Sequence, residues 1–271
     1  MQKLLKGFWF LLTFVLLTLL TQVGGIVLLF SYGISRLPVF PNFRKFRTLV
    51  VFILLYFVTS IFIIPPMASL NGRVPLNIFN QTLRPLNFMT CLLNRHYVRD
   101  ELKQSVLEIS QQMNQKYPGT ILYYLDASFP FIDKYPLLPH LSHNDGKKLD
   151  ICFFYKSIQG EKLRGHPSII GYGVYEGPKP SETNMPQYCR SAGYWQYGIM
   201  KKIIPQFRKK NFLFDEARTK SLILNLVQHK NIKSIYIEPH LKERLKLSDP
   251  KIKFHGCFAV RHDDHIHINL N

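Results

Sequence analysis

Two long uncharged stretches near the start of the chain constrain its folding most strongly. Residues 8–35 and 48–71 contain no charged side chain and are rich in Leu, Phe, Val and Ile. Each stretch is long enough to cross a hydrocarbon core of about 30 Å as a helix. A cleaved signal sequence would account for only one of them, and its apolar part is usually about 7–15 residues long. We therefore expect a membrane anchor in residues 1–71, with transmembrane helices at about 8–33 and 48–68.

The loop between these two stretches bears on the orientation of the anchor. It carries four basic residues and no acidic one: Arg36, Arg44, Lys45 and Arg47. Such an excess favours the cytoplasmic side of a membrane. Basic residues also flank the outer ends of the spans, so the difference is small. The four basic residues in this short loop favour an orientation in which the C-terminal part is exported.

Beyond residue 71 the chain is basic, with 29 Lys and Arg against 17 Asp and Glu. A basic surface attracts nucleic acids, anionic lipids or anionic polymers. The sequence has no aromatic–basic motif of an RNA-binding sheet and no paired cysteines at zinc-finger spacing. We therefore expect a lipid bilayer, and no nucleic acid, as a partner.

Four cysteines are spaced too widely and irregularly for a metal site made of thiolates: Cys91, Cys152, Cys189 and Cys257. In an oxidising compartment they could form one or two disulfides, and complete pairing has three possible connectivities. Cys152 falls within an apolar strand, where a buried thiol behaves as a small hydrophobic side chain.

Periodicity predicts a mixture of helices and strands after the anchor. Apolar residues recur at helical spacing in 99–115, which indicates an amphipathic helix. Further helices are predicted at 214–228 and 239–247, and strands at 120–125, 232–237 and 253–270, the last as a strand pair or hairpin. Residues 158–198 are predicted to be a long loop that forms one wall of a cleft. The predicted fold is α+β, a small antiparallel sheet with flanking helices. Residues 72–119 would be a juxtamembrane connector and helix, and 120–271 the sheet domain.

Two histidine clusters carry the chemistry. The first is His140, His143 and Asp150, on a loop that enters the apolar run 151–155. The second is His262, His265 and His267. In a strand, side chains two residues apart share a face, so His265 and His267 would point the same way. Two or three imidazoles and a carboxylate are what a catalytic zinc takes from a protein while one position stays open for water.

These motifs resemble those of the penicillin-insensitive murein endopeptidases. That family belongs to a zinc peptidase group with the D-alanyl-D-alanine dipeptidases, the lysostaphin-type enzymes and the hedgehog signalling domain. The matching stretches are His140-Leu141-Ser142-His143 with Gly146 and Asp150, and His262-Asp263-Asp264-His265-Ile266-His267. The resemblance covers about residues 120–271, although the middle loop matches poorly. Lys148 departs from the family pattern, which usually has an acid two residues before the aspartate ligand.

The resemblance implies a role for each matched residue. Zn2+ would be held by His143, Asp150 and His267. His265 would polarise the amide carbonyl or stabilise its oxyanion, and His262 would be the general base. His140 would lie behind the ligands or on the substrate side. The remaining histidines, which match no family motif, are predicted to be surface or structural residues: His96, His166, His229, His240 and His255.

The function implied is a membrane-anchored zinc peptidase. It would hydrolyse an amide in peptidoglycan cross-links, as a D-alanyl endopeptidase, from the bacterial inner membrane with its catalytic domain in the periplasm. One alternative is a non-hydrolytic zinc-binding receptor or scaffold at the membrane, against which the presence of His262 and His265 argues. Another is a basic membrane protein that binds lipid or nucleic acid and whose histidines are incidental.

Overall fold

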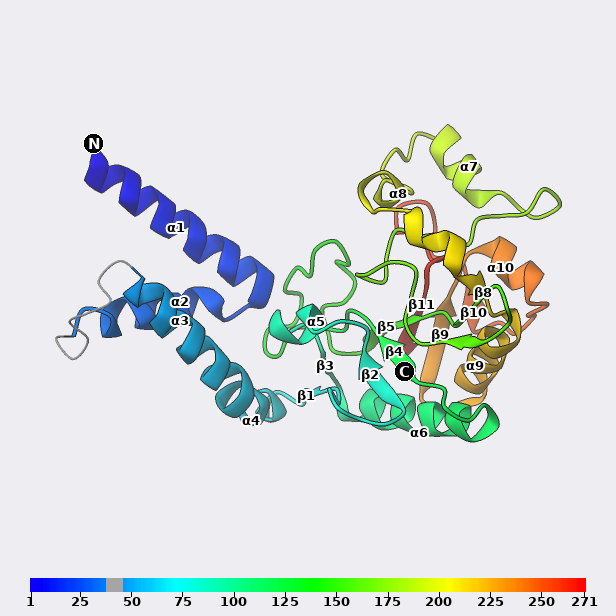
Figure 1. The fold of residues 1–271 in the computed structure, drawn as a ribbon, viewed down its shortest axis with the longest axis horizontal. Helices are drawn as coiled ribbons and strands as arrows, with labels where there is room; N and C mark the ends of the chain where they lie inside the picture. The colour runs from blue at the N-terminus through cyan, green and yellow to red at the C-terminus, as the bar shows by residue number, and fades with distance from the viewer. Residues whose placement is uncertain (38–45) are drawn as a thin grey trace.

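A pair of long apolar helices lies to one side of the rest of the chain (Figure 1). The structure is a computed structural model that describes residues 1–37 and 46–271. Helix α1 (Gln2–Thr21) and the continuous helix Arg47–Leu70 are long and apolar enough to cross a membrane, judged by length and composition. Only 6% and 11% of their apolar windows are buried, so neither is a core helix of the domain that follows. These two helices are the candidate spans.

The first predicted span is not one helix from residue 8 to residue 33. Helix α1 ends at Thr21, Gln22 has a positive φ of 68°, and α2 (Gly24–Ile34) turns back along the chain. A Cβ atom on Gly25 would lie 2.0 Å from Oγ1 of Thr18, so this close packing of α2 on α1 requires a glycine. The break therefore follows from small residues inside an apolar run, where hydropathy alone shows no boundary.

The second span agrees with its predicted position. It consists of α3 (Arg47–Val58), a π-helical turn (Thr59–Ile63) and α4 (Ile64–Leu70), which contains Pro65 and Pro66. Proline lacks a backbone N–H, so Pro65 and Pro66 interrupt the hydrogen bonds to the carbonyls four residues earlier, beside the π-helical turn. Arg44 and Lys45, which contribute to the predicted orientation, lie outside the described residues.

The domain is mixed α/β and is built on a six-stranded sheet with the order β10-β9-β11-β5-β4-β2. The central strands are antiparallel, as predicted, but the edge pairs β10–β9 and β2–β4 are parallel. The strands are β2 (Leu83–Pro85), β4 (Leu122–Tyr124), β5 (Lys148–Cys152), β9 (Ile232–Tyr236), β10 (Ile252–Lys253) and β11 (His265–Leu270). Smaller sheets pair β1 (Val74–Pro75) with β3 (Tyr97–Val98), and β6 (Tyr155–Lys156) with β7 (Lys162–Leu163) and β8 (Leu213–Phe214).

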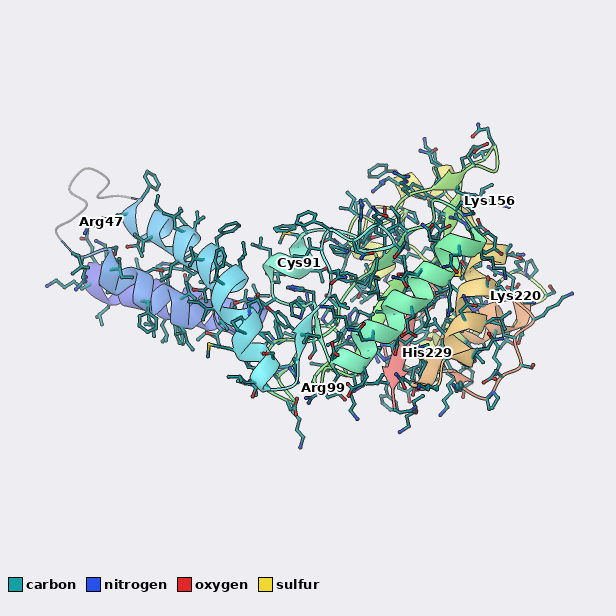
Figure 2. All side chains as sticks on the ribbon, turned by 90° about the horizontal axis from the view of Figure 1, so that it is seen from below. Arg47, Cys91, Arg99, Lys156, Lys220 and His229 are labelled. Carbon is teal, nitrogen blue, oxygen red and sulfur yellow. A yellow bond between two sulfur atoms is a disulfide. The ribbon has the colours of Figure 1, made fainter. Side chains whose placement is uncertain are left out.

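One face of the large sheet forms the hydrophobic core. Leu149 and Ile151 of β5, and Ile266 and Ile268 of β11, are fully buried and alternate with polar residues. They pack in one cluster with the apolar faces of α6 (Asp100–Lys116) and α9 (Glu216–Gln228), which lie side by side (Figure 2). Both helices were predicted from periodicity and are confirmed. The alternating polar residues are left on the opposite face.

The C-terminal strands do not form the predicted hairpin. Strand β10 pairs in parallel with β9 at the edge of the sheet, whereas β11 lies between β9 and β5 in its centre. Residues 254–264 therefore cross from the edge to the middle of the sheet instead of making a tight turn. This connection carries His255 and His262.

Residues 72–119 contribute to the same core as the sheet domain. Leu83 of β2 and the buried face of α6 pack in the cluster that contains β5 and β11. The predicted helix at 239–247 is the shorter α10 (Pro239–Arg244). The remaining helices are α5 (Met89–Leu92), α7 (Met185–Ser191), α8 (Met200–Ile203) and a 3-10 turn at Phe207–Asn211. Residues 158–198 are largely without regular structure, as predicted, apart from β7 and α7.

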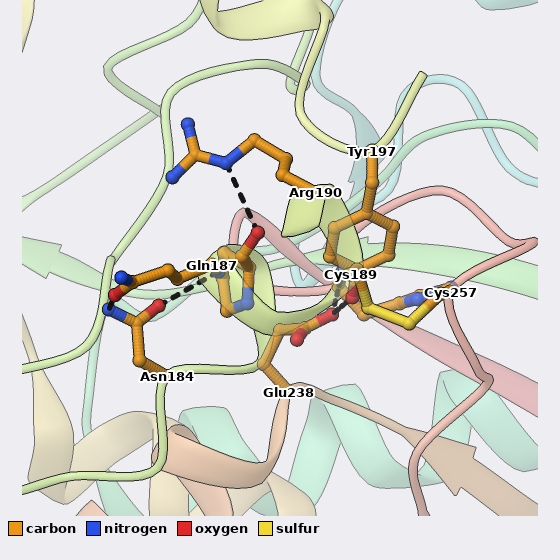
Figure 3. Close-up of a disulfide and its surroundings, with 9 residues drawn as sticks. Asn184, Gln187, Cys189, Arg190, Tyr197, Glu238 and Cys257 are labelled. Carbon is orange, nitrogen blue, oxygen red and sulfur yellow. Dashed lines mark hydrogen bonds between the residues drawn. A yellow bond between two sulfur atoms is a disulfide. The ribbon is translucent and has the colours of Figure 1, made fainter. Parts of the chain in front are cut away.

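One disulfide joins Cys189 in α7 to Cys257 in the connection before β11 (Figure 3). Cys91 and Cys152 are buried free thiols, and Cys152 is the small buried side chain that was predicted. Tyr197 and Glu238 lie beside the disulfide, where the Tyr197 hydroxyl donates to Oε1 of Glu238. The disulfide thus ties the connection 254–264 to the long middle loop.

Candidate metal centre

Three side chains from distant parts of the chain meet on the polar face of the sheet. Asp150 of β5 and His267 of β11 are directly opposite each other in an antiparallel pair, so their side chains share a face. His143 reaches the same point from the loop before β5. Its Nε2 atom lies 3.0 Å from Nδ1 of His267 and 3.2 Å from Oδ1 of Asp150. The distance from Nδ1 of His267 to Oδ1 of Asp150 is 2.8 Å.

The far sides of the two rings show which nitrogens carry hydrogen. Nδ1 of His143 lies 2.8 Å from the carbonyl oxygen of Ala127, which can only accept, so Nδ1 is the donor. Nε2 of His267 lies 2.8 Å from Oδ1 of Asn269 and donates in the same way. In the neutral form of each ring, the remaining nitrogen presents a lone pair toward the Asp150 carboxylate. Three electron-pair donors thus converge, and the outer hydrogen bonds fix both rings as they do in metal sites.

Burial and charge set the protonation of this group. Burial would raise the pKa of the fully buried Asp150, but His143 and His265 outweigh it and hold the pKa well below its usual value. Burial lowers the pKa of His267 to about 4, against the opposing effect of Asp150. At neutral pH the site therefore offers a carboxylate and a neutral imidazole, the forms that bind metal.

His140 is also within range of a metal ion at this site. The ligand atoms of His140, His143 and Asp150 lie within 4.8 Å of one another, and this buried group can hold a metal ion. Nδ1 of His140 is 3.4 Å from Oδ2 of Asp150 but closer, 3.1 Å, to Oδ2 of Asp126. Because two carboxylate oxygens face this nitrogen, we assign it as a donor. His140 and His267 are therefore both candidates for the third ligand, and the resemblance of the histidine motifs implies His267.

His265 lies two residues before His267 in β11, on the same face of the strand, and points into the same space. Its Nδ1 lies 2.5 Å from Oδ1 of Asp264, and its buried Nε2 has no hydrogen-bond partner. Burial opposes the charged ring, but the carboxylates of Asp150 and Asp264 outweigh it and raise the pKa of His265 to about 9. His265 can therefore carry a proton on Nε2 and donate it into the cavity.

His262 is the third histidine of the C-terminal motif that reaches the site. Its ring centroid lies 5.0 Å from that of His265 and 5.6 Å from that of His267. Glu238 holds the backbone of His262 by two hydrogen bonds. The His262 N–H donates to the side-chain Oε1 of Glu238 at 3.2 Å, and the Glu238 N–H donates to the His262 carbonyl at 3.1 Å. Burial and then the neighbouring histidines lower the pKa of His262, so it is an uncharged base.

The site opens into a cavity of about 160 Å³ that contains six histidines. A larger groove of about 510 Å³ adjoins it. Both are lined by the rim residues Pro139, His140, Phe258, Ala259, Val260 and His265. A substrate that extends along the groove would therefore reach the metal-binding side chains.

Several residues of the site were missed in the sequence. The Tyr172 hydroxyl, from the long middle loop, donates to Oδ2 of Asp150 at 2.9 Å. Asp126 binds His140, and Glu238 supports His262 as described above. His255 was predicted to be a surface or structural residue, yet its ring stacks on that of His267 at 5.7 Å and lines the cavity. Only the histidine composition of residues 255–267 signalled His255.

The other residues that were set aside lie away from the cavity. His96, His166 and His240 are buried structural histidines, and His229 pairs with Glu108. The Lys148 ammonium pairs with Asp145 at 2.6 Å, so the charge at this departure from the family pattern has a local partner.

Comparison with models of protein families finds no match, and no curated protein matches the chain. The interpretation of the site therefore depends on its geometry and on the two motifs.

Proposed function

We propose that the protein is a membrane-anchored zinc peptidase that hydrolyses an amide bond in the peptide cross-links of peptidoglycan. The observation that carries this proposal is the convergence of His143, Asp150 and His267 in a cavity that also holds His262 and His265. The choice of peptidoglycan, and of a D-alanyl endopeptidase activity, comes from the resemblance of the two histidine motifs.

The residues fit a zinc ion. Ligand atoms about 2.1 Å from a tetrahedral zinc lie about 3.4 Å apart. The three measured separations, 2.8 to 3.2 Å, need only small movements of the side chains. When bound, zinc would lower the pKa of a coordinated water to about 7 and polarise a carbonyl group. His143 Nε2, Asp150 Oδ1 and His267 Nδ1 would hold it.

The remaining residues supply binding and proton transfer. Nε2 of His265 would donate to the oxygen of the scissile amide, where negative charge develops. The neutral ring of His262 would accept a proton from the attacking water and return it to the leaving amine. His140 and Tyr172, both close to Oδ2 of Asp150, would hold the carboxylate in place.

The disulfide supports an exported domain. Disulfides persist in oxidising compartments such as the bacterial periplasm and are rare in the cytosol. The Cys189–Cys257 bond therefore agrees with a catalytic domain on the periplasmic side of the inner membrane. The two candidate spans would hold the domain there.

The test uses the purified full chain in detergent, with metal measured by mass spectrometry and peptidoglycan digestion followed by chromatography. We expect one zinc per chain and loss of cross-linked muropeptide dimers, both abolished by a chelator and by His143→Ala. His262→Ala should keep zinc and lose activity. His229→Ala, a histidine away from the cavity, is the matched control. Bound zinc with intact dimers would instead favour the non-hydrolytic receptor or scaffold, and absence of zinc the basic lipid-binding domain.

A further inference from the structure

The domain is fastened to the apolar helices by segments that also border the site. The first is residues 87–94, which contain α5. The Tyr56 hydroxyl in the second apolar helix donates to the carbonyl of Leu92 at 2.7 Å. Nδ2 of Asn94 donates to the same hydroxyl at 3.1 Å and faces the carbonyl of Thr21 at 3.4 Å. Arg95, the next residue, pairs with Asp126, the partner of His140.

The second fastened segment is the loop 131–141, which leads into the first histidine motif. The N–H of Phe131 donates to Oε1 of Gln22 at 2.8 Å, and the Tyr135 hydroxyl donates to the carbonyl of Thr18 at 2.7 Å. Thr18 lies in the last turn of α1, and Gln22 is the first residue after the helix. The loop that delivers His140 and His143 is thus attached to the domain-side end of the first candidate span.

These contacts hold both segments against the apolar helices. Tyr56 lies within the apolar helix and not beyond its end, so the segment that binds it lies beside apolar helix surface. The two segments expose large apolar side chains: Phe88, Met89, Leu92, Ile132, Leu138 and Leu141. Such exposure costs free energy in water but suits contact with lipid.

The 510 Å³ groove runs from the first of these segments to the metal-binding cavity. Its volume is typical of sites that hold small molecules. One wall comes from residues 87–93, and apolar side chains such as Ile170, Ile199 and Met200 line it further along. Its two arginines are neutralised, Arg95 by Asp126 and Arg261 by Asp263. The groove therefore suits a hydrocarbon chain better than a free anion.

We propose that the substrates are lipid-linked peptides taken from the bilayer. The hydrocarbon chain lies in the groove beside α5, and the peptide amide reaches the cavity across the shared rim. This inference rests on the proposed peptidase function and narrows its substrates to peptides that are attached to a lipid.

The test compares two probes with the full chain in vesicles of phosphatidylethanolamine and phosphatidylglycerol. One probe is a cross-linked stem-peptide dimer with a palmitoyl chain, and the other is the same dimer without it. We expect kcat/KM to be at least about tenfold higher for the acylated probe. Met89→Asp, which places a charge in the groove wall, should lower this ratio by about tenfold. Phe79→Asp, an exposed phenylalanine outside the groove, should leave the ratio unchanged.

A binding measurement separates this inference from the proposed function. The His143→Ala chain is irradiated with an acylated probe that carries a photoreactive group in its palmitoyl chain, and labelled residues are mapped by mass spectrometry. Labels in 87–93, 196–200 or 258–260 support the groove, whereas labels confined to the apolar helices overturn it. An unchanged ratio in Met89→Asp would also overturn it, because the preference would reflect partitioning alone. If neither probe is cleaved, the peptidase proposal fails, and the labelling still decides what the groove binds.

Discussion

His143 and His267 are 124 residues apart in the sequence, yet their Nε2 and Nδ1 atoms face each other at 3.0 Å. In the neutral form of each ring this nitrogen presents a lone pair, because the opposite nitrogen donates to an oxygen. Two lone pairs and a carboxylate at this separation repel one another unless a cation lies between them. A metal ion is therefore expected to stabilise the folded protein as well as to serve its chemistry.

The identity of the third ligand can be tested directly. His267→Ala removes a lone pair from the convergent group, and we expect the zinc content to fall below about a tenth of the wild-type value. His140→Ala removes a residue whose Nδ1 lies beside Oδ2 of Asp150 and helps to hold the carboxylate in place. We expect metal affinity to fall by only about 10- to 100-fold. Titration with a zinc indicator measures both. The assignment is wrong if His140→Ala loses zinc and His267→Ala retains it.

The proton on His265 is expected to matter for turnover and not for metal binding. His265→Ala removes a donor aimed at the amide oxygen, and loss of such a donor lowers kcat by about 10²–10³. Asp264→Asn keeps the His265 ring but removes a carboxylate that raises its pKa, so a smaller fraction of the ring is protonated and a smaller loss of kcat is expected. Steady-state kinetics on muropeptide dimers should show the change in kcat, with zinc content unchanged. A kcat within a factor of three of wild type in His265→Ala would rule out this role.

The raised pKa of Glu238 predicts how the stability of the folded protein depends on pH. Burial and then the charge of Asp263 raise its pKa to about 7, from 4.5. Below pH 4.5 both the folded and unfolded states hold this proton. Between pH 4.5 and 7 only the unfolded state releases it, so the folded state loses stability as pH rises, by on the order of 2–4 kcal/mol.

Glu238→Gln should remove this dependence, because the amide keeps an oxygen acceptor for Tyr197 and for the N–H of His262. We expect the variant to gain melting temperature over wild type at pH 8 and much less at pH 5. A thiol-reactive dye that labels the buried Cys91 and Cys152 on unfolding gives the readout. Glu108→Gln, at an exposed carboxylate, is the control. An equal gain at both pH values would contradict the prediction.

The disulfide is expected to hold the connection that carries His262. Loss of such a bond costs about 2–4 kcal/mol of stability. The double variant Cys189→Ser, Cys257→Ser should therefore melt at a lower temperature and show lower kcat/KM, because residues 254–264 are freed at one end. Wild-type protein treated with a reductant should behave in the same way. Stability and activity equal to wild type in both samples would show that the sheet alone positions His262.

The parts of the fold that could be predicted have a local periodic signal. Helices α6 and α9 were recognisable because apolar residues recur every three or four positions. The pairing of His265 with His267 on one face follows from the two-residue period of a strand. The hairpin prediction was wrong because β10 has only two residues and pairs with a strand that precedes it, which leaves no pattern in the neighbouring sequence.

The missed site residues depend on tertiary contacts. Tyr172 lies in a loop without periodicity and reaches Asp150 only because that loop folds over the sheet. His255 is brought against His267 by the crossing of residues 254–264. Asp126 has a recognisable role only once His140 is placed beside it. Nothing in the residues around Tyr172 and Asp126 distinguishes them from ordinary loop residues, and only the nearby histidines of residues 262–267 signalled His255.

The central position of β11 has a consequence for biosynthesis. Strands β5 and β9 emerge from the ribosome before the strand that separates them in the sheet, so neither has its main partner until residues 265–270 follow. His267 arrives with that same strand. The chain therefore acquires its completed sheet and its metal-binding group in one event, and a nascent chain that lacks β11 cannot bring His143, Asp150 and His267 together.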